Sequence, residues 1–422
     1  MRRIYFFVCI IVLCCINSAQ AHLPCPVNAR GVLQCDAEVK SSYKKSVSLH
    51  FDVNSREESY AARMLTKSLQ ERGYVINANS GDYSIKFFID KRGYDAEAFA
   101  IIPEGNVIKI IGGDYRGLIY GALSLSEDLR NEILLDNAVA RSEKPKLMLR
   151  AVKYDLPWDT YRHSEALNLH DETCRDPKYW EAFLDMMAEN RLNALSLWNL
   201  HPYPFMIIPK NYPEASPFTK EEFKEWQKLF QSIIGMAAER AIETYLIPFN
   251  IFVTPEFSVA HNVAMDNLDH HFYVRGETAQ IVKDYTRECV TQVLEEYPDL
   301  TGFGLTLGEG MAGMTPQERE AWMTETIIEG MRRANRPSKL VHRVPFSSTT
   351  ESLGNTSVET ERITRASIER EADMGFTEGP IFADFKFNWS HSLSTPKLIK
   401  VHGGPLYAVS YTHLRAHETG RN

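Results

Sequence analysis

The stretch LTGFGLTLGEGMAGM, Leu300 to Met314, begins as an apolar strand and ends in a glycine-rich turn. Runs dense in Leu and Phe are typical of buried strands. Glu309 lies where the strand gives way to the turn, with a glycine on each side. Glycine lets a ligand approach the backbone, and a buried charge is costly unless it is hydrogen-bonded. Two interpretations remain open: a catalytic acid at the C-terminal end of a barrel strand, or a glutamate that caps a helix or forms an ion pair.

Strand and helix patterns alternate on both sides of this stretch. Asp176 before Pro177, for example, is a typical helix start. The expected strands are 147–155, 193–200, 242–253, 300–307, 339–346 and 379–388, and the expected helices are 176–190, 221–240, 279–296, 315–334 and 357–373. About six such βα units in a row, without hairpin signals, predict a parallel sheet, most commonly a (β/α)₈ (TIM) barrel. A doubly wound open sheet is the alternative, but polar and aromatic residues at nearly every strand end favour the barrel.

A smaller α/β domain is expected before the barrel, over residues 46–140. Ser46 to Val53 alternates as a strand, a helix should run from Ser55 to Gly73, and Ala96 to Ile111 should form a hairpin. A helix over 116–131 and a polar linker over 141–146 complete the domain. Its glycines lack a full phosphate-binding fingerprint, so no nucleotide site is expected.

Composition and the N-terminus bound the function. The 422 residues fit a small domain plus a barrel of typically ~250 residues, and the net charge of -8 argues against nucleic acid as the main partner. Residues 1–21 have a basic start, a short apolar run and a small-residue cleavage site, and so predict a signal peptide, a leader over 22–45 and a periplasmic or secreted protein. No other run approaches a membrane span of ~18 apolar residues.

Four cysteines remain after the signal peptide. Cys25 and Cys35 are close enough to form a small disulfide loop, and two free thiols are the alternative. Cys174 and Cys289 are isolated within helical patterns and are expected to be buried apolar residues.

Polar and aromatic residues gather at the predicted strand ends, which converge on one face of a barrel. Trp beside carboxylates, amides and His suits sugar rings, because aromatic faces stack on the ring and polar groups bind hydroxyls. On the last strand Asp384, Lys386 and Asn388 share one parity. The candidate substrate-binding residues are Trp158, Arg162, Trp198, Asn199, His201, Asn250, Glu256, Arg343, Lys386, Asn388, Trp389 and His391. Each has a plainer alternative: Trp158 as a core residue, His201 as a loop cap, Arg343 and Lys386 as partners of interior carboxylates.

A histidine-containing loop follows the third barrel strand. Its residues His261, Asp266, His270 and His271 fit no standard zinc spacing. We expect a solvated lid there, and no metal or cofactor is predicted.

Residues 110–123, IIGGDYRGLIYGAL, resemble the small N-terminal domain shared by β-hexosaminidases and α-glucuronidases. In those families it packs beside a catalytic (β/α)₈ barrel. Hexosaminidases carry an Asp-Glu pair after the fourth strand, whereas this chain has Gly308-Glu309, which is similar to the lone general acid of α-glucuronidases. The resemblance implies that Glu309 is the general acid, with Asp384 as a candidate second carboxylate, and that Arg343 and Lys386 bind an acidic sugar.

The chain is therefore expected to be a secreted glycoside hydrolase that removes a sugar, with a uronic acid as one candidate, from a polysaccharide side chain. A non-catalytic carbohydrate-binding protein on a degenerate barrel and a β-N-acetylhexosaminidase are the alternatives. The barrel is expected over 147–408 and to fall short of eight strands. Residues 409–422 are polar, lack an apolar period and are expected to be a non-native tail.

Overall fold

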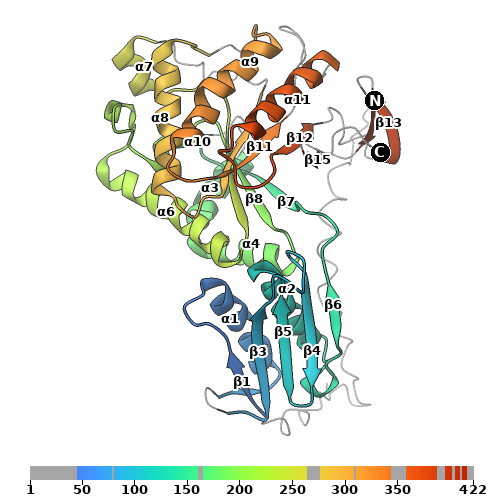
Figure 1. Ribbon diagram of the computed structural model, residues 1–422. Helices are drawn as coiled ribbons and strands as arrows, with labels where there is room; N and C mark the ends of the chain where they lie inside the picture. Colours follow the sequence, from blue (N-terminus) through green and yellow to red (C-terminus); the bar gives the residue numbers. More distant parts are fainter. Residues whose placement is uncertain are drawn as a thin grey trace, which may run out of the picture.

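The computed structural model describes residues 45–77, 80–159, 165–263, 276–307, 310–343, 358–386, 395–401, 404–408 and 411–415, with backbone only from residue 384 onward. The predicted signal peptide and the pair Cys25 and Cys35 lie outside these residues. Two large sheets with their helices make up most of the described part, one below the other in Figure 1, and a separate two-stranded sheet completes it. Among the described residues, none of the helices combines the length and apolarity needed to span a bilayer.

The lower sheet has six strands in the order β2-β1-β3-β5-β4-β6. The predicted hairpin is confirmed, since β4 pairs antiparallel with β5. The first three residues of the expected linker form β6 instead, an edge strand paired with β4. None of the three residues of β6 is buried, so the strand carries no apolar pattern that sequence reasoning could detect. The elements are β1 (Ser46–His50), α1 (Arg56–Glu71), β2 (Val75–Ile76), β3 (Tyr83–Ile89), β4 (Phe99–Glu104), β5 (Val107–Gly112), α2 (Tyr115–Arg130), the 3-10 turn Leu135–Asn137 and β6 (Arg141–Glu143).

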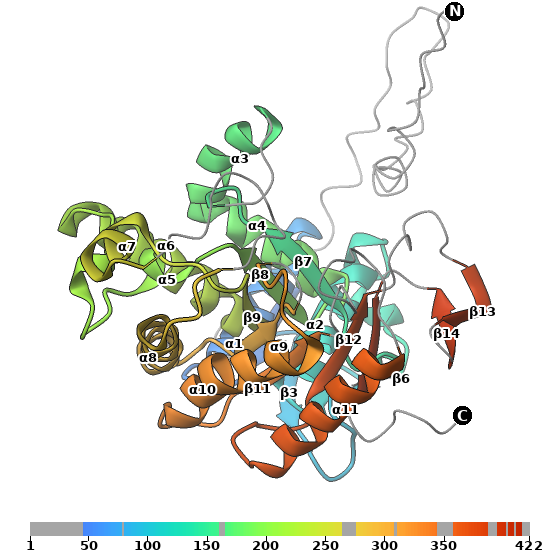
Figure 2. The same cartoon turned by 90° about the horizontal axis from the view of Figure 1, so that it is seen from above.

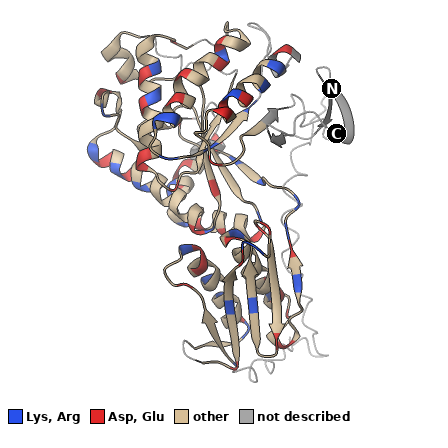
Figure 3. Ribbon diagram, viewed as in Figure 1, with Lys and Arg blue, Asp and Glu red and all other residues tan. Residues whose placement is uncertain are grey.

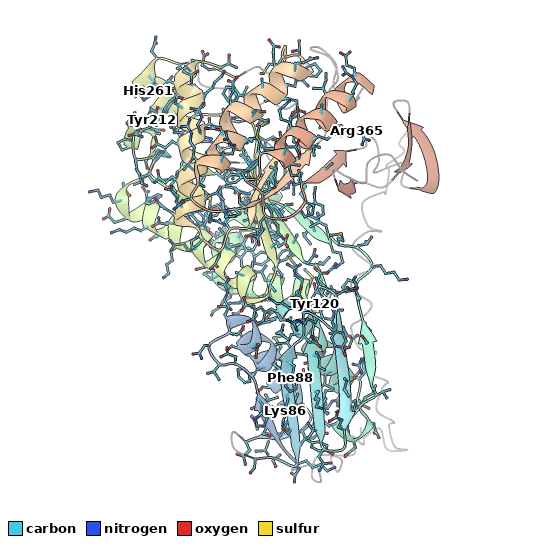
Figure 4. The ribbon with its side chains drawn as sticks, viewed as in Figure 1. Lys86, Phe88, Tyr120, Tyr212, His261 and Arg365 are labelled. Atoms are coloured by element: carbon cyan, nitrogen blue, oxygen red, sulfur yellow. The ribbon has the colours of Figure 1, made fainter. Side chains whose placement is uncertain are left out.

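The glycines of the GGDYRG segment serve helix packing. A Cβ on Gly117 would lie 2.1 Å from the backbone oxygen of Ala98, so only glycine lets α2 approach the hairpin this closely. Asp114 caps the helix by accepting from the Gly117 amide at 2.7 Å. Arg116, beside them, pairs with Glu97 at 2.6 Å and with Glu243 of the upper sheet at 3.2 Å. This segment therefore ties the two sheets together. Tyr120 of the same helix also lies where they meet (Figure 4), and it accepts a hydrogen bond from Arg150 at 2.9 Å.

The upper sheet has the order β15-β12-β11-β10-β9-β8-β7. Six parallel strands follow one another in chain order within the described residues, and β15 pairs antiparallel with β12. A doubly wound sheet would reverse its strand order at a switch point, so that alternative is wrong and the incomplete barrel is confirmed. The strands are β7 (Ala151–Asp155), β8 (Ala194–Asn199), β9 (Glu243–Pro248), β10 (Gly302–Leu305), β11 (Lys339–Arg343), β12 (Phe382–Lys386) and β15 (Tyr411–Arg415), and β13 (Thr395–Val401) pairs separately with β14 (Gly404–Ala408).

Helices cover the outer side of this sheet, in the arc seen from above in Figure 2. Their starts follow the sequence signals: Asp176 caps α4 before Pro177, and Thr219 and Thr315 each form a capping box. The single helix expected over 315–334 is interrupted by a π-helical turn. The helices are α3 (Glu165–Arg175), α4 (Pro177–Glu189), α5 (Tyr203–Met206), α6 (Lys220–Glu239), α7 (Pro255–His261), α8 (Gln280–Glu296), α9 (Pro316–Met323), α10 (Glu329–Arg333) and α11 (Val358–Asp373), with the π turn Thr324–Ile328 and the 3-10 turn Pro213–Ala215.

Two hydrophobic clusters lie on opposite sides of the upper sheet. The larger, between strands and helices, includes Trp180, Phe230 and Phe303 and continues into the lower domain. The smaller, on the inner face, includes Trp198 and Tyr245. Cys174 and Cys289 are buried free thiols, as predicted. The inner face is therefore the concave side on which a barrel site is expected.

Candidate functional site

Trp198 is the centre of the inner face at the carboxyl end of the sheet. Its indole is 4% exposed and donates from Nε1 to Ser196 Oγ at 3.0 Å. Lys153 Nζ lies 4.2 Å from the ring centroid, and Arg343 Cζ lies 5.3 Å from it. Lys153 also pairs with Asp155 at 3.1 Å. We call these four residues, Lys153, Asp155, Trp198 and Arg343, the Trp198 cluster.

Strand register explains why these residues meet. Lys153 is aligned with Ser196, and Asp155 is aligned with Trp198. Aligned residues of neighbouring strands share a face, and every second residue returns to it. Three of the four come from adjacent strands β7 and β8, and Arg343 comes from β11 across the face. The carboxyl ends of parallel barrel strands are where substrates bind, so the position suits a binding site.

The Trp198 cluster carries one net positive charge, because Asp155 offsets one of its two cations. Arg343 is 3% exposed, and its guanidinium is always charged. Phe249 packs edge-on against Trp198 with centroids 5.8 Å apart, which limits water around the indole. A carboxylate bound in such surroundings gains more from a cation than it would in water. The cluster can thus offer positive charge to a ligand, and an aromatic surface where the Lys153 side chain moves aside.

Asn250 lies beyond the end of β9 and presents an unused acceptor. Its side-chain amide donates to the backbone oxygen and hydroxyl of Thr306, which in turn donates to Pro248 O at 2.7 Å. The Asn250 side chain is 2% exposed, and its Oδ1 accepts no hydrogen bond from any residue that the structure describes. Buried acceptors are rarely left without a donor, so Oδ1 is available to a group outside the described part of the chain or to a ligand.

Asn199 and His201 organise the loop after β8. Asn199 donates to Trp158 O at 2.7 Å and accepts from the His201 amide at 3.1 Å. His201 Nε2 lies 2.9 Å from the Tyr285 hydroxyl, and burial lowers the pKa of His201 to about 3. The imidazole is therefore neutral. The hydrogen bonds of both side chains are made inside the protein, which agrees with the loop-cap alternative for His201.

Asp159 shares this loop and is one of the polar residues at the predicted strand exits, although it is not among the candidate site residues. Its Oδ2 accepts from the His201 amide at 2.8 Å, and its φ of 49° turns the chain sharply after Trp158. Burial raises the pKa of Asp159 to about 6, although the hydrogen bond from His201 opposes this shift. The only sequence signal was its place at a strand exit.

Trp158 and Glu256 lie apart from the Trp198 cluster. Trp158 packs in the larger hydrophobic cluster, with its ring centroid 4.8 Å from that of Trp226 and 6.1 Å from that of Phe230. This is the environment of a core residue and corrects the expectation of a sugar platform. Glu256 is exposed in the first turn of α7, where a carboxylate favours the helix dipole.

The other candidates have no described side chain. Arg162, Glu309, Asn388, Trp389 and His391 lie outside the described residues, as do Asp266, His270 and His271 of the expected lid. The backbones of Asp384 and Lys386 are in β12, and Asp384 is in register with Arg343. His261 is the last residue of α7. It pairs with Glu214 at 2.6 Å and lies beside Tyr212 (Figure 4).

Sequence reasoning missed Lys153 as a member of the cluster. The sequence did hold a signal for it. Lys153 and Asp155 are two residues apart on the expected first barrel strand, so their side chains share one face of the sheet. Across the molecule, Lys and Arg are interspersed with Asp and Glu along the helices (Figure 3). The concentration of two cations against one indole is therefore a local feature.

No protein-family model matches this chain, and no curated protein matches it. Among solved structures it is similar to a GH138 enzyme targeting pectin rhamnogalacturonan II, with 27% identity and a TM-score of 0.61 over 71% of this chain. The match covers 35% of the GH138 chain, so this sequence spans about a third of that protein. It is also similar to a Streptomyces plicatus β-hexosaminidase, with 13% identity and a TM-score of 0.50 over 78% of this chain and 69% of the other. The N-terminal α/β domain followed by a partial (β/α) barrel is thus a glycoside hydrolase fold, as the resemblance predicted.

Proposed function

We propose that this protein is an exported glycoside hydrolase that removes a uronic acid from a pectin-type polysaccharide. In this proposal the sugar displaces the Lys153 side chain from the face of Trp198 and stacks there, and its carboxylate pairs with Arg343 and Lys153. The observation that carries the proposal is the placement of both cations within 5.3 Å of one indole at the carboxyl end of the sheet. Uronic acids present an apolar ring face and a carboxylate together, which is the combination that this cluster complements.

The GH138 enzyme supports the choice of polysaccharide. That protein targets pectin rhamnogalacturonan II, and its similarity to this chain extends over 71% of the residues. Since this sequence spans about a third of that enzyme, a shared substrate is part of our proposal. Arg suits the role better than Lys would, because its planar fork pairs with both oxygens of a carboxylate.

Glu309 is the proposed general acid. It follows β10, whose neighbours in the sheet are β9 and β11, the strands that lead to Asn250 and Arg343. An apolar strand end raises the pKa of a carboxyl group and keeps it protonated for transfer to the leaving oxygen. Asp384, in register with Arg343, is the proposed second carboxylate, which serves as base or nucleophile. The separation of the two carboxylates would decide between inversion and retention.

The direct test uses the full chain and pectin-derived oligosaccharides that end in a uronic acid. Wild type should release the terminal sugar, Glu309→Gln should reduce turnover by at least about 100-fold, and the exposed Glu221→Gln on α6 should match wild type. Equal turnover by Glu309→Gln would remove this residue from the chemistry. Thermal unfolding of each variant would show that the loss is not one of folding.

A non-catalytic carbohydrate-binding protein is the second candidate. It is favoured by the state of Asp155, the carboxylate of the Trp198 cluster, which is already paired with Lys153. Calorimetric binding of the same oligosaccharides without product after long incubation would select it. A β-N-acetylhexosaminidase is the third, and cleavage of N-acetylglucosaminides with inhibition by a thiazoline would select that one.

A further inference from the structure

A second polar cluster lies on the helix side of β11, behind Arg343. Neighbouring residues of a strand point to opposite faces, so His342 faces the helices where Arg343 faces the inner side. His342 Nε2 lies 3.0 Å from Glu320 Oε2 of α9 and 3.6 Å from Glu371 Oε1 of α11. The side chains of His342 and Glu371 are fully buried, and that of Glu320 is 4% exposed. We call the three residues the Glu320–His342–Glu371 cluster.

The charge of this cluster is not balanced by its own members. Two carboxylates and one imidazole carry a net negative charge even when the imidazole is protonated, and buried charge is costly without compensation. Thr364 donates to Glu320 Oε1 at 2.7 Å, which satisfies one carboxylate. Neither oxygen of Glu371 receives a hydrogen bond from the described residues. The exposed Arg370 lowers the pKa of Glu371 through its charge, but its guanidinium donates to Ser367 at 3.0 Å. A fully buried carboxylate therefore points at the cluster without a hydrogen-bond donor.

The spacing of the three side chains suits a cation. One ligand atom from each residue lies within 4.8 Å of the other two. Ligands at ~2.0–2.1 Å in a tetrahedral zinc site lie roughly 3.3 Å from one another, and the 3.0 and 3.6 Å separations lie on either side of that value. The donor set, one imidazole and two carboxylates, is one that zinc accepts. The Thr364 hydroxyl would orient Glu320 as a supporting partner of a ligand does.

An ion could reach the cluster from the surface. A cavity of about 420 Å³ lies between α9 and α11 and is lined by Glu320, Thr324, Ser367 and Arg370 among others. Arg365, labelled in Figure 4, marks the position of α11, the helix that also carries Glu371. Glu320 thus joins an open groove to the buried cluster.

We propose that the Glu320–His342–Glu371 cluster binds one divalent transition-metal ion, with Zn²⁺ as the best fit, and that the ion fastens β11 to α9 and α11. This role is structural, because the ligands are buried on the helix side of the strand, away from the Trp198 cluster. By fixing β11 the ion would also fix Arg343, the next residue along the strand. The proposal is independent of the proposed function.

Protons are the competing occupants of this cluster. Burial alone would lower the pKa of His342, but the charges of Glu320 and Glu371 outweigh it and raise the value to about 9. Burial raises the pKa of Glu371 to about 7. A metal ion would have to displace such protons, since metal ligands bind in their deprotonated forms. A cluster held together by protons alone is the outcome that the experiment must distinguish.

The test is calorimetric titration of the chelator-treated full chain with zinc chloride at pH 7.5. Wild type should bind about one zinc per chain and unfold at a higher temperature in its presence. Glu371→Gln keeps the size of the side chain and should bind at least about tenfold more weakly, and Thr364→Val about 10–100-fold more weakly. The exposed Glu369→Gln on the same helix is the matched control and should bind like wild type.

Two results would overturn the metal site. One is a chelator-treated wild type that unfolds cooperatively, binds no zinc and shows no thermal shift with zinc or manganese. The other is a Glu371→Gln variant that binds zinc as tightly as wild type. Should Glu371→Gln not fold, the wild-type titration and Thr364→Val still decide the matter.

Discussion

Arg343 and Trp198 come from strands that are three apart in the sheet, yet the guanidinium carbon lies 5.3 Å from the indole centroid. This contact crosses the inner face, because the two long side chains together span the roughly 14 Å that three strand spacings cover. A cation over an indole contributes roughly 2 kcal/mol or more when water is excluded. The pair therefore links β8 to β11 and also places a charged group where we propose that a sugar binds.

Replacing Arg343 should separate acidic from neutral ligands. Arg343→Met keeps much of the side-chain bulk and removes the charge, so binding of uronate-terminated oligosaccharides should weaken about 10–100-fold. Binding of the matching neutral oligosaccharides should change less than about threefold, because stacking on Trp198 does not need the charge. Calorimetry with both ligands measures the difference, with the exposed Arg332→Met as control. Equal losses for both ligands would contradict a carboxylate-binding role.

His201 should make the fold sensitive to acid. Its pKa is about 3 when folded and near 6.5 when unfolded, so the unfolded chain binds the proton first as the pH falls. The stabilisation is fully present above about pH 6.5 and is lost progressively toward pH 3. His201→Gln should lose less of its free energy of unfolding than wild type between pH 7 and pH 5, by about 1–2 kcal/mol in urea titrations. Parallel curves for the two proteins would show that His201 is not the acid-sensitive group.

Asp159 should act in the opposite direction over a similar range. Its folded pKa of about 6 is above the unfolded value of 3.8, so the folded chain binds the proton more tightly. Its contribution is fully present below about pH 4 and is lost as the pH rises through 6. Asp159→Asn can still accept the His201 amide hydrogen bond and should stabilise the protein at pH 7.5 by about 1–2 kcal/mol, without doing so at pH 4. A variant less stable than wild type at pH 7.5 would contradict this assignment.

Two glycines offer a matched test of helix packing. A Cβ on Gly117 would meet the Ala98 oxygen at 2.1 Å, whereas a Cβ on Gly235 in α6 would meet nothing within 4 Å. Gly117→Ala should therefore destabilise the fold by about 1–3 kcal/mol through overpacking. Gly235→Ala should stabilise it by up to about 1 kcal/mol, since alanine favours the helix. Chemical unfolding of both variants checks the pair, and a neutral Gly117→Ala would mean that α2 can move away from the hairpin.

Local signals in the sequence predicted the elements better than their ends. The cap Asp176 with Pro177 depends on neighbours in the chain and is confirmed. The strand expected over 242–253 ends at Pro248, because the chain leaves the sheet before Ile251, whose φ is 60°. No local pattern marks the point where the chain leaves the sheet, since four of the five residues over 249–253 are apolar and still read as strand.

Contacts between distant residues were harder to predict. Its place at a predicted strand end made Trp198 a candidate, but its meeting with Lys153 depends on strand register, which the sequence does not state. The Glu320–His342–Glu371 cluster joins two helices and a strand, and none of its members is close to another in the chain. Glu309 could be chosen from its glycine setting alone, and its role stays a prediction.

Trp158 and Trp198 illustrate this difference and give the last prediction. Trp158 follows β7, and Trp198 lies next to the last residue of β8. The chain turns at Asp159, and Trp158 packs against Trp226 and Phe230 in the core. Trp158→Phe should lower the free energy of unfolding by about 1–3 kcal/mol and leave the Kd for oligosaccharides within about twofold. Trp198→Phe removes the indole next to Lys153 and Arg343 and should weaken binding at least about tenfold. Thermal unfolding and calorimetry on both variants provide the comparison; a Trp158→Phe variant that keeps its stability and loses binding would return Trp158 to the sugar site.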